Sequence, residues 1–154
     1  MPTMTAAQKR AHAKAEYDAF LAACPSRILL DRISDKWVTL TVSALGGGGS
    51  PKPGGGYGDG PRPMRYSELS RRLAGVSQKM LTQTLRSLER DGLVTRTATP
   101  TVPVTVTYEL TDLGLSLLQL VRGIKGWAET HMDDVLAHRA KHDAGASDQG
   151  PPEQ

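Results

Sequence analysis

The chain has very little cysteine: Cys24 is its only thiol, so an intrachain disulfide is impossible. Aromatic residues make up only 5% of the sequence, which argues against a sugar-binding surface or a surface that stacks single-stranded bases. No apolar run is long enough to span a membrane. The alanine-rich stretch 5–17 lacks the apolar core of a signal peptide, because charged residues and a histidine interrupt it. We therefore expect a cytoplasmic protein.

Signals for catalysis or metal binding are also missing. Three of the four histidines, His131, His138 and His142, lie in the C-terminal part of the chain, and His12 lies near the other end. His138 and His142 have the i, i+4 spacing of a helix face, but no carboxylate ligand is expected beside them in a rigid setting. No motif gathers a nucleophilic serine with a histidine and an aspartate. We expect no enzymatic activity, no cofactor and no metal site.

Two segments have compositions that do not favour a folded core. Residues 46–61 are mostly glycine and proline, and such a segment cannot bury enough apolar surface to offset the entropy of ordering it. We predict a flexible insert at 46–63. The alternative, a phosphate-binding loop, requires a Gly-x-x-x-x-Gly-Lys-Ser/Thr pattern that is absent. Residues 141–154 are predicted to be a disordered tail.

The N-terminal third is predicted to be helical. Residues 5–23 form an alanine-rich helix whose apolar anchors are Phe20 and Leu21, with Tyr17 as a further candidate, and Cys24-Pro25 ends it. A second helix over 26–33 is expected to turn its apolar side chains inward. A third helix begins after Ser34-Asp35, which is a natural N-cap. The apolar residues assigned to these two helices are Ile28, Leu29, Ile33, Trp37, Leu40, Val42 and Leu45.

Residues 77–92 form the most informative segment, because they predict a helix with two chemically different faces. Leu81, Leu85 and Leu88 recur at the i, i+4, i+7 spacing of one apolar stripe, between a serine N-cap and a glycine stop. The opposite side carries Lys79, Gln83, Arg86 and Arg90, flanked by Gln78 and Thr82. Cations, amides and hydroxyls can bind phosphates and base edges, as a DNA recognition helix does. An ordinary amphipathic surface helix is the alternative.

The segments on both sides favour DNA recognition. Residues 66–73 predict a short helix that ends at Gly75, and two short helices joined by a glycine-containing turn form a helix-turn-helix. Residues 93–97 and 104–110 are rich in β-branched residues, and the second run alternates in polarity. Prolines at 100 and 103 stiffen the connection between them. Helix, turn, helix and hairpin, in this order, indicate a winged helix.

Charge is concentrated on the same segment. Residues 62–96 contain eight Lys and Arg and three acidic residues, a net charge of +5, whereas the whole chain carries +3. A local basic excess is the electrostatic signature of a polyanion-binding surface. The alternative is a solvated charged surface.

Several motifs together resemble the HxlR-type winged-helix transcriptional regulators, which are relatives of the MarR group. The resemblance covers residues 24–131 apart from the insert, and its motifs are Cys24-Pro25, Lys36-Trp37, 75–83, 85–89, 91–94, Pro100, Val102-Pro103, Val106, 108–111 and Leu113-Gly114. It implies a dimeric, sequence-specific DNA-binding protein, commonly a repressor or activator of its own or an adjacent gene. The sequence departs from the family pattern at Ser34-Asp35, Gln78 and Thr84, and the last two leave the operator open.

Under this interpretation the candidate DNA-binding residues have distinct roles. Lys79, Thr82 and Gln83 read bases, and Gln78 and Arg86 contribute at the groove edge beside the N-cap Ser77. Phosphates are held by Ser67, Arg71, Arg72 and Arg90, while Arg96 and Thr101 of the wing meet the minor groove or backbone. The alternative function is a winged-helix module that binds another protein without specific DNA binding.

The last predicted helix, 112–140, indicates a homodimer. Thr111 is its expected N-cap, and the apolar stripe that follows resembles a coiled-coil seam. With Phe20 of the first helix, the predicted interface consists of Leu113, Leu117, Leu120, Ile124, Trp127 and His131. The alternative is that this helix folds back on Trp37 and Leu40. The predicted organisation is thus a dimerisation helix at 1–23, a winged helix at 24–111, a dimerisation helix at 112–140 and the tail.

Cys24 is a candidate redox sensor. It stands at the start of a helix, where backbone N–H groups stabilise a thiolate, and Arg27 lies nearby. The resemblance adds that some HxlR-like proteins use a cysteine at this place to sense oxidants or electrophiles. The alternative is a small buried residue near the dimer base. No small-molecule effector can be named from the sequence.

Overall fold

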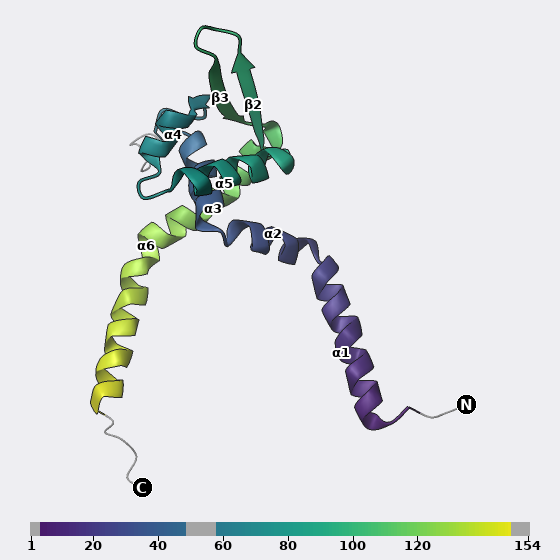
Figure 1. Cartoon of the computed structure of the whole chain (residues 1–154). Helices are drawn as coiled ribbons and strands as arrows, with labels where there is room; N and C mark the ends of the chain where they lie inside the picture. Colours follow the sequence, from purple (N-terminus) through teal and green to yellow (C-terminus); the bar gives the residue numbers. More distant parts are fainter. Residues whose placement is uncertain (1–3, 49–57, 149–154) are drawn as a thin grey trace.

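The computed structural model describes residues 4–48 and 58–148. Three N-terminal helices are followed by a short strand, two short helices, a hairpin and one long helix (Figure 1). In order they are α1 (Ala6–Ala23), α2 (Pro25–Ile33), α3 (Lys36–Leu45), β1 (Met64–Arg65), α4 (Tyr66–Arg72), α5 (Gln78–Arg90), β2 (Val94–Thr99), β3 (Thr105–Leu110) and α6 (Asp112–Asp148). This is the mainly helical winged helix-turn-helix that the sequence predicts. Figure 1 shows α1 and the distal part of α6 leaving the body as two separate arms.

The sheet is antiparallel with the order β1-β3-β2. The predicted hairpin is confirmed, and its register pairs Val94 with Leu110 and Thr97 with Thr107. The third strand, β1, was not predicted; it pairs Met64 with Tyr108. Two residues are too few to show the alternation by which a strand is recognised, so only the pairing with β3 reveals it.

The core lies where α3, α5, α6 and the sheet meet. The three predicted α5 leucines, Leu81, Leu85 and Leu88, are all buried, with 0–2% of their surface exposed. They pack in one cluster with residues of α3 and α6, including Leu45 and Leu118. Burying a leucine side chain stabilises a fold by about 1.5–3 kcal/mol, so this cluster determines which face of α5 points inward.

The first two helices form as predicted but pack differently. Thr5 and Gln8 form a reciprocal capping box at the start of α1. Every residue of α1 and α2 is described, and none of them is buried. Phe20 is 69% and Ile28 59% exposed, so the expected inward packing of α2 is wrong for a single chain. The reason is visible in Figure 1: α2 runs outward from the body instead of lying across it.

Two predictions of disorder need correction. Helix α6 continues to Asp148, so residues 141–148 are helical, whereas 149–154 lie outside the described residues. The alanines of this stretch have high helix propensity, which explains the longer helix.

The two ends of the insert are ordered as well: Gly47 is buried and has a φ of 102°, and a Cβ there would lie 2.6 Å from the backbone nitrogen of Gly60. Glycine thus lets two backbones approach closely, while residues 49–57 are outside the described part.

Over the described residues, no helix combines the length and the apolar character needed to cross a bilayer.

Candidate nucleic-acid interface

The helix-turn-helix is formed by α4, a tight turn and α5. Gly75 in the turn has a φ of 87°, a backbone conformation that side chains disfavour. Ser77 caps α5, because its hydroxyl accepts a hydrogen bond from the Met80 N–H at 3.1 Å. The Tyr66 hydroxyl donates to the Gln78 carbonyl at 3.0 Å. Helix α4 is therefore tied to the N-terminal end of α5, the end that enters the major groove in helix-turn-helix proteins.

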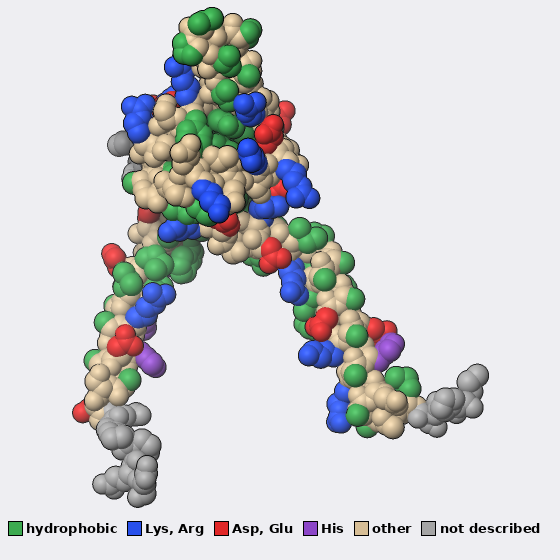
Figure 2. All heavy atoms as spheres, in the orientation of Figure 1, with side chains coloured by type: hydrophobic (Ala, Val, Ile, Leu, Met, Phe, Trp, Pro, Cys, Tyr) green, Lys and Arg blue, Asp and Glu red, His purple; other side chains and the backbone are tan. Residues whose placement is uncertain are grey.

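The polar side chains predicted to read bases share the outer face of α5. Gln78, Lys79 and Gln83 are exposed, and Thr82 is partly exposed beside them. Arg86 and Arg90 continue the exposed face toward the C-terminal end. Figure 2 shows Lys and Arg side chains around α5 and the base of the wing, whereas the wing tip carries hydrophobic side chains. Thr84, by contrast, is buried and is 4% exposed.

The predicted phosphate-binding residues of α4 lie in two different settings. Ser67 and Arg71 are exposed, and the Arg71 Nε donates to the Ser67 carbonyl at 3.4 Å. Arg72 instead donates to the Gly47 carbonyl at 3.3 Å and lies 3.8 Å from a Glu68 carboxylate oxygen. Arg72 thus holds the base of the insert against α4, a structural contact that sequence spacing alone does not show.

Glu68 lies in a cluster of cations. The Arg62 guanidinium donates two hydrogen bonds to its carboxylate. These hydrogen bonds lower the pKa of Glu68, and the charges of Arg62, Arg72 and Arg71 lower it further. Glu68 is therefore ionised at neutral pH, and its negative charge offsets part of the basic excess on this side of α4.

The wing brings a further cation to α5. Arg96 of β2 lines a cavity of about 370 Å³ together with Thr82, Arg86, Glu89 and Tyr108. The predicted wing residue Arg96 and the predicted α5 residue Arg86 thus line the same cavity, as does the acidic Glu89. Two arginines that line one cavity are suited to contact the same stretch of sugar-phosphate backbone.

At the wing tip, Thr101 has partners within the hairpin. Its hydroxyl donates to the Pro103 carbonyl at 2.8 Å and lies 3.1 Å from the Thr105 hydroxyl. These contacts shape the turn, and the expected DNA contact of Thr101 stays a prediction.

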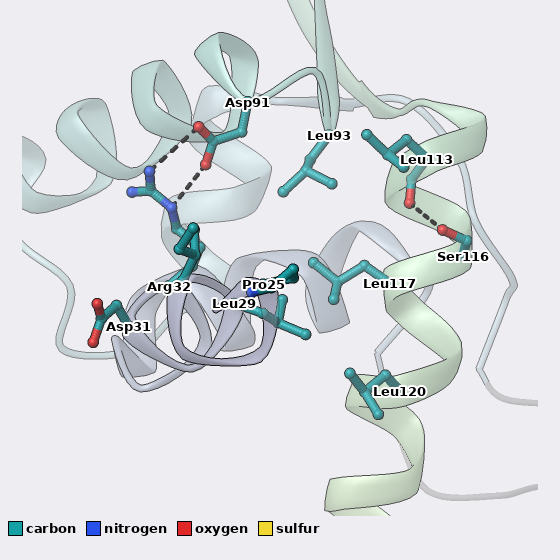
Figure 3. Close-up of a pocket in the computed structure, with 11 residues that line it drawn as sticks. Pro25, Leu29, Asp31, Arg32, Asp91, Leu93, Leu113, Ser116, Leu117 and Leu120 are labelled. Atoms are coloured by element: carbon teal, nitrogen blue, oxygen red, sulfur yellow. Dashed lines mark hydrogen bonds and ion pairs between the residues drawn. The ribbon is translucent and has the colours of Figure 1, made fainter. Parts of the chain in front are cut away.

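Arg32 contacts the end of the candidate recognition helix, a contact that was not predicted from the sequence. Its Nη1 donates to the Ser87 hydroxyl at 2.6 Å, and its Nε lies 2.7 Å from the Asp91 carboxylate (Figure 3). Ser87 and Asp91 are 55 and 59 positions from Arg32 along the chain, so no local sequence pattern predicts the contact. Ser87 is in the last turn of α5 and Asp91 is its C-cap. Arg32 therefore connects α2 to the end of the candidate recognition helix.

The predicted interface residues of α6 are present as an uncovered apolar stripe. Leu113, Leu120, Ile124 and Trp127 are each 46–58% exposed, and the His131 ring stacks on Trp127 with centroids 4.8 Å apart. An apolar groove of about 930 Å³ separates the first turns of α6 from α2 (Figure 3). Its walls include Leu29, Leu93, Leu113, Leu117 and Leu120, and Arg32 and Asp91 lie at its edge.

Cys24 occupies the junction between α1 and α2, as the C-cap of the first and the N-cap of the second. It is a half-buried free thiol. The backbone N–H groups of Arg27 and Ser26, at the start of α2, lower the pKa of the thiol. The position predicted from the sequence thus has the geometry that stabilises a thiolate, through N–H groups of the helix start.

Comparison with known proteins agrees with this geometry. The family model described as HxlR-like helix-turn-helix matches residues 58–135. An HTH-type transcriptional regulator of Escherichia coli (strain K12), YtfH, itself uncharacterized, is 37% identical over 80% of this chain and 87% of its own. A solved structure described as a transcriptional regulator, ytfH from Salmonella typhimurium, shares 36% identity with a TM-score of 0.62, covering 79% of this chain and 96% of its own.

A regulator with a redox function is also similar in structure. The redox regulator HypR in its reduced form shares 31% identity with a TM-score of 0.61, over 74% of this chain and 99% of its own. The match of the family model to half of the chain, together with relatives above 30% identity, agrees with the helix-turn-helix, the wing and the long last helix. The chain therefore belongs to the HxlR-like helix-turn-helix family of transcriptional regulators.

Proposed function

We propose that this regulator is a homodimer that binds a palindromic double-stranded DNA operator in the cytoplasm, with no catalytic activity of its own. The observation that carries the proposal is the outer face of α5, on which Lys79, Gln83 and Arg86 are exposed while three leucines behind them are buried. An element with this geometry can enter a major groove without disturbing the core.

In this proposal the contacts divide by chemistry. Lys79 is suited to guanine, because its ammonium can donate to the O6 and N7 acceptors, and Gln83 is suited to adenine through its amide. Thr82 and Gln78 assist at the adjacent bases. Arg71, Arg86, Arg90 and Arg96 contact phosphates, which give affinity and register rather than sequence preference.

The dimer follows from the uncovered apolar surfaces. Most of the stability of a helix in a protein comes from tertiary packing, and α1 has no buried residue in a single chain. A second copy that packs against the α6 stripe and against Phe20 of α1 removes both surfaces from water. A two-fold axis then places the two α5 helices on half-sites about one DNA turn apart, roughly 34–36 Å.

The decisive experiment is selection of bound sequences from random DNA by the full chain. A palindromic consensus is the expected result, with affinity that falls linearly in a log–log plot against salt. Lys79→Ala should weaken binding and relax one position of the consensus, whereas Arg71→Ala should weaken all DNA alike and reduce the salt slope by about one. Arg139→Ala, an exposed cation on the distal part of α6, is the charge-matched control. Failure to enrich any sequence would favour the alternative of a protein-binding winged helix.

We further propose that Cys24 makes the regulator responsive to oxidants or electrophiles. The lowered pKa of the thiol supports this role, and so does the similarity to a redox regulator. Because the chain has one cysteine, oxidation would join two subunits or attach a small thiol. The test is operator affinity before and after diamide treatment: the native protein should change its affinity reversibly with thiol reductant, and Cys24→Ser should not. An unreactive Cys24 would rule the role out.

A further inference from the structure

We propose that Arg32 sets the separation between the two recognition helices of the dimer and thereby selects the spacing of the operator half-sites. This inference rests on the proposed function. The inference starts from one contact: Arg32 of α2 is held against the last turn of α5. Helix α2 is also the helix from which the α1 arm extends.

The contact is a clamp with three points. The Arg32 Nε lies 2.7 Å from one Asp91 carboxylate oxygen, and its Nη2 donates to the other at 3.3 Å. Its Nη1 donates to the Ser87 hydroxyl at 2.6 Å. A guanidinium that binds a carboxylate through two nitrogens has a defined plane, so the pair fixes an orientation as well as a distance. The cation also lies at the C-terminal end of α5, where the helix dipole favours positive charge.

Few other contacts determine where α2 lies. No residue of this fully described helix is buried, and the apolar groove of about 930 Å³ separates it from α6 on its other side. The Thr39 hydroxyl, bonded to the Ile33 carbonyl at 2.8 Å, links the C-terminal end of α2 to α3. Among the residues that the structure describes, the Arg32 clamp is therefore the polar contact that relates the direction of α2 directly to α5.

The direction of α2 matters because the arm continues from it. Helix α1 joins the N-terminal end of α2 at Cys24 and extends away from the body (Figure 1). If α1 and the α6 stripe form the dimer, then a rotation of α2 relative to α5 moves each recognition helix with respect to the two-fold axis. The same rotation occurs in both subunits, so the change in separation between the two recognition helices is doubled.

The clamp is partly exposed, with 41% of the Arg32 side chain and 28% of the Asp91 side chain accessible to solvent. Exposed ion pairs contribute little to folding stability. Loss of the clamp should therefore change the geometry of the dimer more than its stability, which makes the two effects separable.

The experiment uses the full chain and a set of operators with identical selected half-sites whose spacer is lengthened or shortened by one or two base pairs. The native dimer should lose about tenfold in affinity for each added or removed base pair, since each rotates one half-site by roughly a tenth of a turn. In Arg32→Gln and in Asp91→Asn, the loss of affinity should be less than about threefold for each base pair added or removed. Both variants should also bind the operator with the best spacer less tightly than the native protein does. The double variant should match either single variant, because both remove the same contact.

Three readouts separate positioning from a merely structural role: binding to an isolated half-site, the slope against salt, and the dimer dissociation constant. All three should equal those of the native protein, because Arg32 contacts neither bases nor phosphates in this assignment. Arg32→Lys should restore the profile only in part, and Asp31→Asn, which changes a neighbouring exposed charge on the same helix, should leave it unchanged.

Two outcomes would overturn the inference about Arg32, and a third would overturn the proposed function as well. A native spacing profile in Arg32→Gln, or an equal loss at every spacer accompanied by weaker half-site binding, excludes a positioning role. If the native protein itself binds no operator or is monomeric, the proposed function fails, and the inference fails with it.

Discussion

Gly114 offers the sharpest test of the packing that holds α5 in place. It lies in the first turn of α6 and is buried against the segment that follows α5. A Cβ at this position would lie 2.1 Å from the Leu93 carbonyl oxygen and 3.1 Å from a Leu110 side-chain carbon. The first of these contacts is with backbone, so it cannot be relieved by a change of rotamer. Gly114→Ala therefore forces α6 and the Leu93 segment apart.

The cost can be worked out from the contacts that must shift. Overpacking of this kind costs about 1–3 kcal/mol. The Leu93 carbonyl also accepts a hydrogen bond from the Thr111 N–H at 3.1 Å, and its loss costs about 1 kcal/mol. Alanine recovers roughly 0.5–1 kcal/mol of helix propensity. The free energy of unfolding should fall by about 1–3.5 kcal/mol, which corresponds to roughly 2–14 °C in Tm for a chain of this size.

The assay is thermal unfolding followed by circular dichroism at one fixed protein concentration, because dimerisation makes Tm depend on concentration. Gly126→Ala is the matched control: it is the same change in the same helix, away from the Leu113–His131 stripe, where a Cβ would meet nothing within 4 Å. That variant should be stabilised by up to about 1 kcal/mol. If both variants gained stability equally, the close approach of α6 to Leu93 would be refuted.

Three further changes test other parts of the molecule. Ser77→Ala removes the cap of α5 and should lower the free energy of unfolding by about 1 kcal/mol, measured in urea, while Ser77→Gly should cost only a few tenths. Glu68→Gln tests pH dependence: because Arg62 lowers the pKa of Glu68, the carboxylate contributes stability above the ordinary glutamate pKa and loses it as pH falls through the lowered value. The difference in Tm between native protein and Glu68→Gln should therefore be greatest near neutral pH and vanish in acid; a difference that is constant with pH would contradict the pairing. Trp127→Ala should raise the dimer dissociation constant by at least about tenfold in analytical ultracentrifugation, since tryptophan is enriched among interface hot spots, whose truncation costs about 2 kcal/mol or more. An unchanged constant would place the dimer contact elsewhere.

Much of the structure of α5 and of the hairpin could be predicted from local patterns. The leucine spacing of α5 predicted its buried face, Ser77 and Gly92 predicted its limits, and alternating polarity predicted the hairpin. Each of these signals is local, because helix and strand periodicities reflect which side of one element meets the core. The exposed position of Lys79 and Gln83 follows from the same periodicity, so the candidate DNA-binding face could be predicted without any knowledge of tertiary contacts.

Composition was a less reliable guide than periodicity. Glycine in the insert indicated flexibility, yet Gly47 and Gly60 lie in close backbone contact, and the alanine-rich end of α6 remains helical to Asp148. The two-residue strand β1 has no pattern of its own and exists through its pairing with β3. Composition limits the conformations that a segment can adopt, whereas packing against neighbouring elements decides which of them it adopts.

The sequence by itself determined the order of the helices and of the hairpin and the side of α5 that faces outward, because these depend on interactions between residues a few positions apart. Only the tertiary structure decided that Arg32 binds Ser87 and Asp91, that Arg72 turns toward Gly47, and that Arg96 and Arg86 line one cavity. These pairs join residues more than nine positions apart. Their contact depends on how whole helices and strands are placed, and no periodicity along the chain encodes that placement.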